Sequence, residues 1–246
     1  MAIDDVKAFG EVNRAAPGDT TDYTYASLVL SRNRSLMVRH ESDMNVRADR
    51  GQYYTLTTTP ATGLAGHAAP TTLDDTKPFF WLMSNYTASD GKRVYLDYLR
   101  TWVTAAGTNG TNLRYGIKVD SGTTRRSSAG TPMTANGVSA QSSTAASVTA
   151  YAGAIVAAAA STSSRLVTHG LIRTVINVVG DQYLFKFGNA DQIPAGIPTE
   201  GTLQLSASFA CPPVVLGPTD QMLFHFFSGS QSAASSHEIE VGFWVA

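Results

Sequence analysis

The sequence predicts an all-β protein, an antiparallel β-sandwich of jelly-roll-like type with an extended N-terminal arm. Two observations support this fold class. Most of the hydrophobic periodicity has period two and is carried by aromatic and β-branched residues, which favour strands. The strand-like runs are separated by short clusters of turn residues, with no convincing helix between them. Runs of this kind assemble into antiparallel sheets, and one domain of 246 residues is normal for the class.

The composition excludes several classes of protein. With 43% hydrophobic residues and a net charge of −1, the chain has enough apolar surface to form a core. The balance of 18 Lys and Arg against 19 Asp and Glu creates no field that would attract a polyanion, so no nucleic-acid partner is expected. No membrane partner is expected either, because the long uncharged stretch that includes Gly130–Ser164 is mostly small and polar. The acidic N-terminus does not resemble a signal peptide.

The N-terminal part is expected to form an arm followed by strands. Residues 1–22 mix acidic residues, turn formers and scattered apolar positions, which is typical of an extended arm rather than a core strand. Residues 23–246 are expected to form a single β-sandwich domain. Its first strands are predicted at Tyr23–Leu30, Leu36–His40, Gln52–Thr58 and Phe79–Met83, with a loop from Pro60 to Pro78.

The segment Arg93–Ala105 fits both helical and alternating spacing. Its Tyr, Val, Trp and Thr content favours a strand. A Gly-Thr-Asn-Gly turn ending at Gly110 follows it and leads into a second strand-like run, Leu113–Val119. We therefore expect these two runs to pair as a hairpin.

The low-complexity stretch Gly122–Ser164 leaves two interpretations open. Alanine favours a helix, but Val148–Val156 contains Gly153 and β-branched residues and has no charged face, so a small-residue strand packed closely against a neighbour is preferred. After Arg165 the strand signal is strong, and the last run holds the C-terminus in a sheet. Five runs are predicted, at Leu166–Val179, Tyr183–Phe187, Thr202–Phe209, Met222–Phe227 and Glu238–Val245.

Nucleophiles and histidines show no catalytic pattern. Cys211 lies in apolar company and is interpreted as a buried small hydrophobe rather than a nucleophile. No Gly-x-Ser-x-Gly motif is present, although a Ser–His–Asp triad could still converge in space, and Ser228-Gly-Ser230 is expected in a loop. His225 is expected to be solvent-facing or hydrogen-bonded, with a role as ligand or base as the alternative. The other histidines are His40, His67, His169 and His237, and none has the spacing of a common metal site.

The charged and aromatic groups also have structural interpretations. The acid pairs Asp4-Asp5 and Asp74-Asp75 are expected to be solvated loop charge rather than a glycosidase pair. Two groups of basic residues are expected to lie on sheet faces or in salt bridges rather than to contact a polyanion. The first group is Arg32, Arg34, Arg39, Arg47 and Arg50, and the second is Arg125-Arg126. A core role is preferred over a carbohydrate platform for the aromatic residues Tyr53, Tyr54, Phe79, Phe80, Trp81, Trp102 and Trp244. No catalytic, cofactor-binding or metal-binding residue is therefore assigned, and no cofactor or enzymatic activity is expected.

Four segments, Arg165–Val167, Arg173–Gly188, Pro218–Phe226 and Ser230–Gly242, resemble virion proteins of tailed bacteriophages. The likeness covers mostly residues 79–246, and some of these proteins are similar to jelly-roll head decoration or auxiliary capsid proteins. The resemblance implies a virion structural protein, assembled in the host cytoplasm, that decorates or stabilises the capsid as a homo-oligomer, with a homotrimer favoured. Its expected partners are the major capsid protein or other virion proteins. The alternative is a tail-associated or fibre-head protein that binds host cell-surface glycan.

Overall fold

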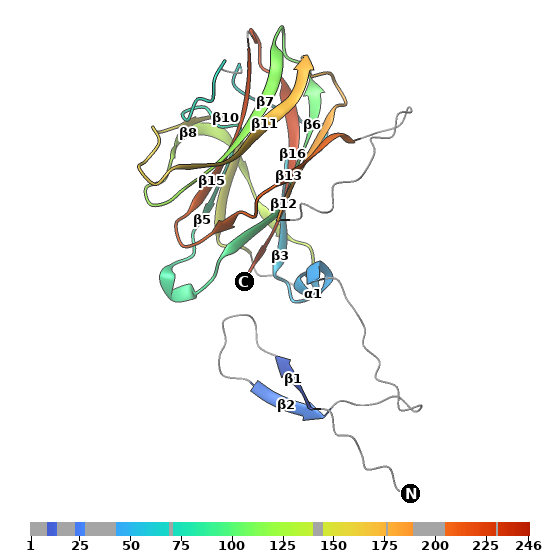
Figure 1. The fold of residues 1–246 in the computed structure, drawn as a ribbon, viewed down its shortest axis with the longest axis vertical. Helices are drawn as coiled ribbons and strands as arrows, with labels where there is room; N and C mark the ends of the chain where they lie inside the picture. Colours follow the sequence, from blue (N-terminus) through green and yellow to red (C-terminus); the bar gives the residue numbers. More distant parts are fainter. Residues whose placement is uncertain are drawn as a thin grey trace, which may run out of the picture.

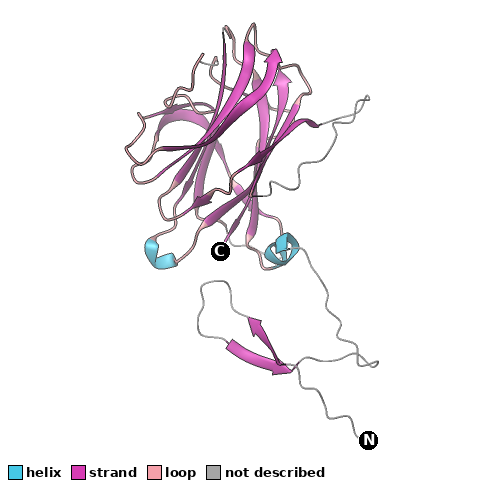
Figure 2. Cartoon of the chain, viewed as in Figure 1, coloured by secondary structure: helices cyan, strands magenta, loops and turns pink. Residues whose placement is uncertain are grey.

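The protein is a β-sandwich in the computed structural model (Figure 1). The structure describes residues 9–13, 23–27, 43–68, 71–139, 145–175, 177–188, 205–229 and 231–246. Strands make up nearly all of its regular structure (Figure 2). Within the described part of the chain, no helix is long and apolar enough to cross a membrane. The predicted all-β sandwich is therefore confirmed.

Two sheets form the sandwich. The six-stranded sheet has the order β11 (Arg165–Val175), β7 (Thr111–Asp120), β15 (Gln221–Gly229), β5 (Phe80–Ser84), β10 (Val148–Ala157) and β8 (Arg126–Met133). The eight-stranded sheet has the order β13 (Leu205–Cys211), β12 (Gln182–Phe187), β6 (Val94–Ala105), β16 (Ser236–Val245), β3 (Tyr53–Thr57) and β9 (Ala135–Gly137). In the same sheet, β14 (Val215–Leu216) pairs with β6 and β4 (Leu64–Ala65) with β16. The pairs are antiparallel except β12 with β13, which is parallel.

The core lies between the two sheets. Phe185 of β12 shows how the layers meet, because its ring centre lies 4.8 Å from that of Tyr115 in β7 and 4.9 Å from that of Phe224 in β15. It also stacks on Phe209 of β13 at 5.0 Å. Alternation along each strand sends apolar side chains to this layer, and their burial is the main stabilising term.

Strand β6 confirms the strand interpretation of 93–105, but the predicted hairpin with β7 is wrong. β6 pairs with β12, β14 and β16, whereas β7 pairs with β11 and β15 in the other sheet. The turn at Asn109 and Gly110 has positive φ values of 54° and 124°, as a tight hairpin turn would. Here the same turn chemistry takes the chain from one sheet to the other.

The low-complexity region is also extended. β10 confirms the strand interpretation of Val148–Val156, and it lies between β5 and β8. Gly153 has φ +100°, and an added Cβ there would lie 3.4 Å from the carbonyl oxygen of Ala65. Strands β8 and β9, the short helix α1 (Asp43–Asp49) and the 3-10 turn Ala88–Asp90 were not predicted from the sequence.

The N-terminal strands form a separate two-stranded sheet. β1 (Phe9–Asn13) pairs antiparallel with β2 (Tyr23–Ser27), so one strand lies within the expected arm and the other within the expected domain. The predicted run Leu36–His40 lies outside the described residues. At the other end, β16 pairs with β6 and β3, which confirms that the C-terminal strand is held in a sheet.

Candidate functional site

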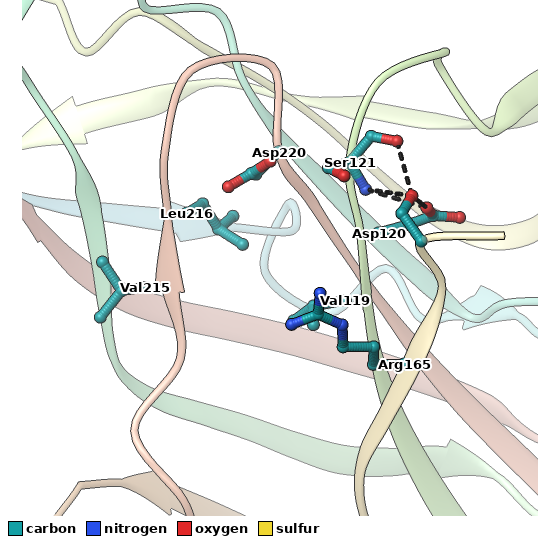
Figure 3. Close-up of a pocket in the computed structure, with 8 residues that line it drawn as sticks. Val119, Asp120, Ser121, Arg165, Val215, Leu216 and Asp220 are labelled. Atoms are coloured by element: carbon teal, nitrogen blue, oxygen red, sulfur yellow. Dashed lines mark hydrogen bonds between the residues drawn. The ribbon is translucent and has the colours of Figure 1, made fainter. Parts of the chain in front are cut away.

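The most polar buried group lies at one end of the six-stranded sheet. Asp120, the last residue of β7, forms an ion pair with Arg125, in which Oδ2 and Nη1 are 2.7 Å apart. Both side chains are almost fully buried. Asp120 also accepts hydrogen bonds from the hydroxyls of Ser161 and Ser163. It accepts a further one from the backbone N–H of Ser121 (Figure 3). Burial acts to raise the pKa of Asp120, but these hydrogen bonds and the arginine lower it to about 2.

The guanidinium of Arg125 has several other partners. It donates to the carbonyl oxygens of Ala158 and Asp75 at 3.0 and 3.1 Å. The backbone N–H of Arg125 donates to the side-chain oxygen of Gln221. The same oxygen accepts a 2.8 Å hydrogen bond from the indole N–H of Trp81. Because both charges are satisfied within the fold, this group is a structural link between strands and loops. Arg125 is a salt-bridge residue, as the sequence suggested.

A cavity of about 260 Å³ lies beside this link. Asp120 and Asp220 both line it, and the Arg165 side chain extends into it from the start of β11 (Figure 3). Asp220 accepts a hydrogen bond from the backbone N–H of Gly217. The side chains of Asp120, Ser163 and Asp220 are therefore engaged in holding loops, and Arg165 is the one exposed cation of the cavity among the described residues.

A loop segment crosses the outer face of the six-stranded sheet. This strap, residues 71–78, is tied by an ion pair of 2.6 Å between Lys118 and Asp75 and by a hydrogen bond from the Ala157 N–H to the Thr76 carbonyl. The Leu73 side chain lies so close to Gly116 that a Cβ added at Gly116 would be 3.0 Å from Leu73 Cδ1. Asp75 thus lies in a loop as expected, but its charge is paired with Lys118 rather than left to solvent.

His225 of β15 is buried near this strap and does not face solvent, contrary to one sequence expectation. Its pKa is lowered to about 4, chiefly because burial disfavours the charged ring, while the nearby charge of Asp75 acts in the opposite direction. The main chain of Lys77 also favours protonation, yet neither ring nitrogen makes a hydrogen bond of normal geometry. The ring is a buried neutral group.

His237 is close to a serine in an arrangement that resembles part of a triad. Its Nε2 shares a 2.8 Å hydrogen bond with the Ser235 hydroxyl. The ring also stacks on Phe226, with ring centres 4.7 Å apart, and Nδ1 has no partner in the described structure. Burial lowers the pKa of His237 to about 3. The adjoining cavity of about 10 Å³ is roughly the space of one water molecule and leaves no room for a substrate.

The other candidate residues lie apart. Cys211 is buried as expected, and burial raises its pKa to about 12. Ser228 lies in β15 rather than in a loop, and its hydroxyl donates to the Thr111 carbonyl. Among the described residues, no three His, Cys, Asp or Glu side chains are grouped to hold a metal ion. The expectations for Asp4, Asp5, Arg32, Arg34, Arg39, His40 and Ser230 lie outside the described residues.

The predicted aromatic core is only partly correct. Tyr53, Tyr54, Phe79, Phe80 and Trp81 are buried. Two half-buried tryptophans lie on the outer face of the eight-stranded sheet, where Trp244 stacks on Tyr95 with ring centres 5.5 Å apart. Arg47 of α1 lies over Trp244 at 4.8 Å, and Arg100 lies over Trp102 at the same distance. Intramolecular contacts therefore already cover ring faces that a sugar would need.

The clearest interaction surface follows β11, the outermost strand of the six-stranded sheet. Within the described part of the chain, only β7 pairs with it (Figure 1). Its exposed side chains include Leu166 and Leu171, which are 46% and 44% exposed, and Val175 at its end, and Val178 and Val179 in the segment that follows are exposed as well. We call these five residues the β11 patch. Exposed apolar side chains beside unpaired backbone groups are typical of a protein-binding edge.

The opposite edge of the same sheet lacks this character. β8 contains Pro132, which has no N–H to donate, and residues Ala129 and Gly130 have positive φ values of 57° and 77°. Such features interrupt strand addition. β11 has two register shifts against β7 but contains no proline, and its exposed Leu and Val side chains make the β11 patch our candidate functional site. Sequence reasoning identified β11 as a strand but had no signal for its place at an edge.

Comparison of the chain with protein-family models, with curated proteins and with solved structures finds no match.

Proposed function

We propose that the protein is a non-enzymatic structural subunit of a tailed-phage virion. In this proposal it assembles as a homo-oligomer, with a trimer favoured, and decorates or stabilises the capsid by binding the major capsid protein or another virion protein. Its place of assembly would be the host cytoplasm. The sequence resemblance supplies the virion context.

The observation that carries the proposal is the β11 patch. A long edge strand with exposed Leu and Val side chains would favour aggregation unless another surface covers it. Association between copies in a closed ring satisfies every such edge, and trimers around a local threefold are one common solution. The buried polar groups, by contrast, are engaged in internal links such as Asp120 with Arg125.

The test is binding to phage heads that lack the protein. Purified protein is mixed with these heads and the particles are imaged by electron cryo-microscopy. We expect ordered density at fixed lattice positions. Bare heads would contradict attachment to the capsid and would direct attention to the tail, where a glycan array would test the alternative expectation.

A second experiment tests the oligomer separately. Native mass spectrometry of the purified full chain should show a defined homo-oligomer, whereas a monomer at all accessible concentrations would contradict that part of the proposal. A matched pair of variants locates the interface. Leu171→Ser should weaken association, and Val156→Ser on β10, at 42% exposure nearly equal to that of Leu171, should not.

A further inference from the structure

We propose that the β1–β2 hairpin of one copy docks on the β11 edge of a neighbouring copy. This inference rests on the proposed homo-oligomer and names the segment that covers its edge. It would extend the six-stranded sheet of each subunit by strands of the next. The contact is between two different surfaces, so it can close into a ring.

The first argument comes from strand pairing. β1 and β2 pair only with each other among the described strands. A two-stranded hairpin is at best marginally stable alone in water, so a docked position is favoured. Between its two register shifts, from Thr168 to Leu171, β11 offers regular backbone N–H and C=O groups along its outer side, and strand addition to such an edge is a common mode of recognition.

The second argument is charge. Residues 1–27 carry five negative charges and two positive charges, so their net charge is −3. The acidic residues are Asp4, Asp5, Glu11, Asp19 and Asp22, and the basic ones are Lys7 and Arg14. On the receiving side, Arg165 begins β11 and Arg114 of β7 is the register partner of Leu171. Both arginines are exposed, and neither has an ion-pair partner among the described residues.

The third argument is reach. Residues 28–42 connect the hairpin to α1. At roughly 3.3 Å per residue, a chain of that length could span up to about 50 Å. That span is greater than the radius of gyration of a domain of this size, which is about 18 Å. The hairpin of one copy can therefore reach a second copy that contacts the first.

Photo-crosslinking tests the occupant without assuming a register. A photoreactive amino acid replaces His169, which is exposed in β11, in oligomers assembled from a mixture of isotope-labelled and unlabelled full-length chains. The same amino acid at Val156 serves as the control. We expect crosslinked peptides that join residue 169 of one isotope form to residues 9–27 of the other.

Each other outcome overturns the inference in a distinguishable way. Crosslinks to 9–27 of the same isotope form only would mean that the hairpin covers the edge of its own subunit. Crosslinks to a different segment of another copy would reject the hairpin but retain the homo-oligomer. A monomer without intermolecular crosslinks would reject both proposals.

A deletion gives an independent test. Removing residues 2–27 should leave the β-type circular dichroism spectrum unchanged and convert the oligomer to monomers, because the cut lies outside both sheets of the sandwich. Leu171→Ser in the full chain should raise the apparent dissociation constant by roughly tenfold or more, as loss of one buried leucine contact predicts. An oligomer that survives the deletion would overturn the inference.

Discussion

At the residue scale, adjacent residues of similar chemistry have different roles. Arg125 is 2% exposed and paired with the buried Asp120, whereas the next residue, Arg126, lies over the ring of Tyr151 at 3.5 Å. A buried ion pair contributes little net stability when intact, but loss of one partner leaves an uncompensated charge. The two arginines therefore provide a matched comparison.

We expect Arg125→Ala to lower the free energy of unfolding by about 3–5 kcal/mol, because Asp120 would remain buried without its cation. Arg126→Ala should cost about 1 kcal/mol or less, the typical value of a cation–π contact near the surface. Urea unfolding at pH 7 measures both values. Equal losses for the two variants would contradict the structural role of the pair.

The buried histidines predict the effect of acid. The pKa values of His225 and His237 in the folded protein, about 4 and about 3, lie below the ordinary value of about 6.5. Below pH 6.5 the unfolded chain therefore binds protons that the folded chain does not, and stability falls as the pH is lowered toward these folded values. Asp120, with a pKa of about 2, adds a further loss below about pH 4.

The measurement is the free energy of unfolding in urea between pH 7.5 and pH 4. We expect it to decrease toward pH 4, with roughly 3 kcal/mol from His225 alone. The variant His225→Leu should have a shallower dependence, because its side chain cannot be protonated. A stability that stays constant between pH 6.5 and pH 4 would contradict this assignment.

At the element scale, close approach between neighbouring strands depends on small residues. Gly242 of β16 pairs with Tyr98 of β6, and an added Cβ would lie 2.3 Å from the Tyr98 ring and 2.5 Å from the Tyr53 hydroxyl. Tyr53 donates to Asp97 at 2.7 Å, and Tyr98 donates to Glu240. The glycine thus makes space for two tyrosines that lean across the strand.

We expect Gly242→Ala to lower the free energy of unfolding by about 1–3 kcal/mol, because both rings must move from their hydrogen-bonded positions. The same substitution in a Tyr98→Ala background should cost less, since the closest obstacle has been removed. A double-mutant cycle in urea measures this coupling. Additive effects would show that the glycine has another role.

At the scale of the whole molecule, stability should be linked to assembly. If copies associate only when folded, mass action makes the melting temperature rise with protein concentration. Differential scanning calorimetry over a hundredfold range of concentration should show this rise for the full chain. The variant Leu171→Ser should reduce it, while Val156→Ser should retain it, and a concentration-independent melting temperature for the full chain would argue against a homo-oligomer.

The sequence alone determined most of the long strands of the sandwich. Alternation and β-branched or aromatic content are local properties, and they were sufficient to identify β3, β5, β6, β7, β10, β11, β12, β13, β15 and β16 within a few residues. Strands β8 and β9 were not predicted, because their small, polar residues lack that signal. The short helix α1 was not predicted either, because seven residues are too few to show a helical hydrophobic periodicity.

Only the tertiary structure decided which strands pair and which faces are buried. β6 and β7 are joined by a hairpin-like turn yet belong to opposite sheets, because each is paired by strands that are distant in sequence. For the same reason Trp81 is buried in a separate cluster with Ile155, Ala157 and Leu223, outside the core between the sheets, while Trp102 stays half-buried on an outer face. The exposure of Leu171 likewise depends on β11 being outermost in its sheet, and an edge is a property of the assembled sheet rather than of any local run of residues.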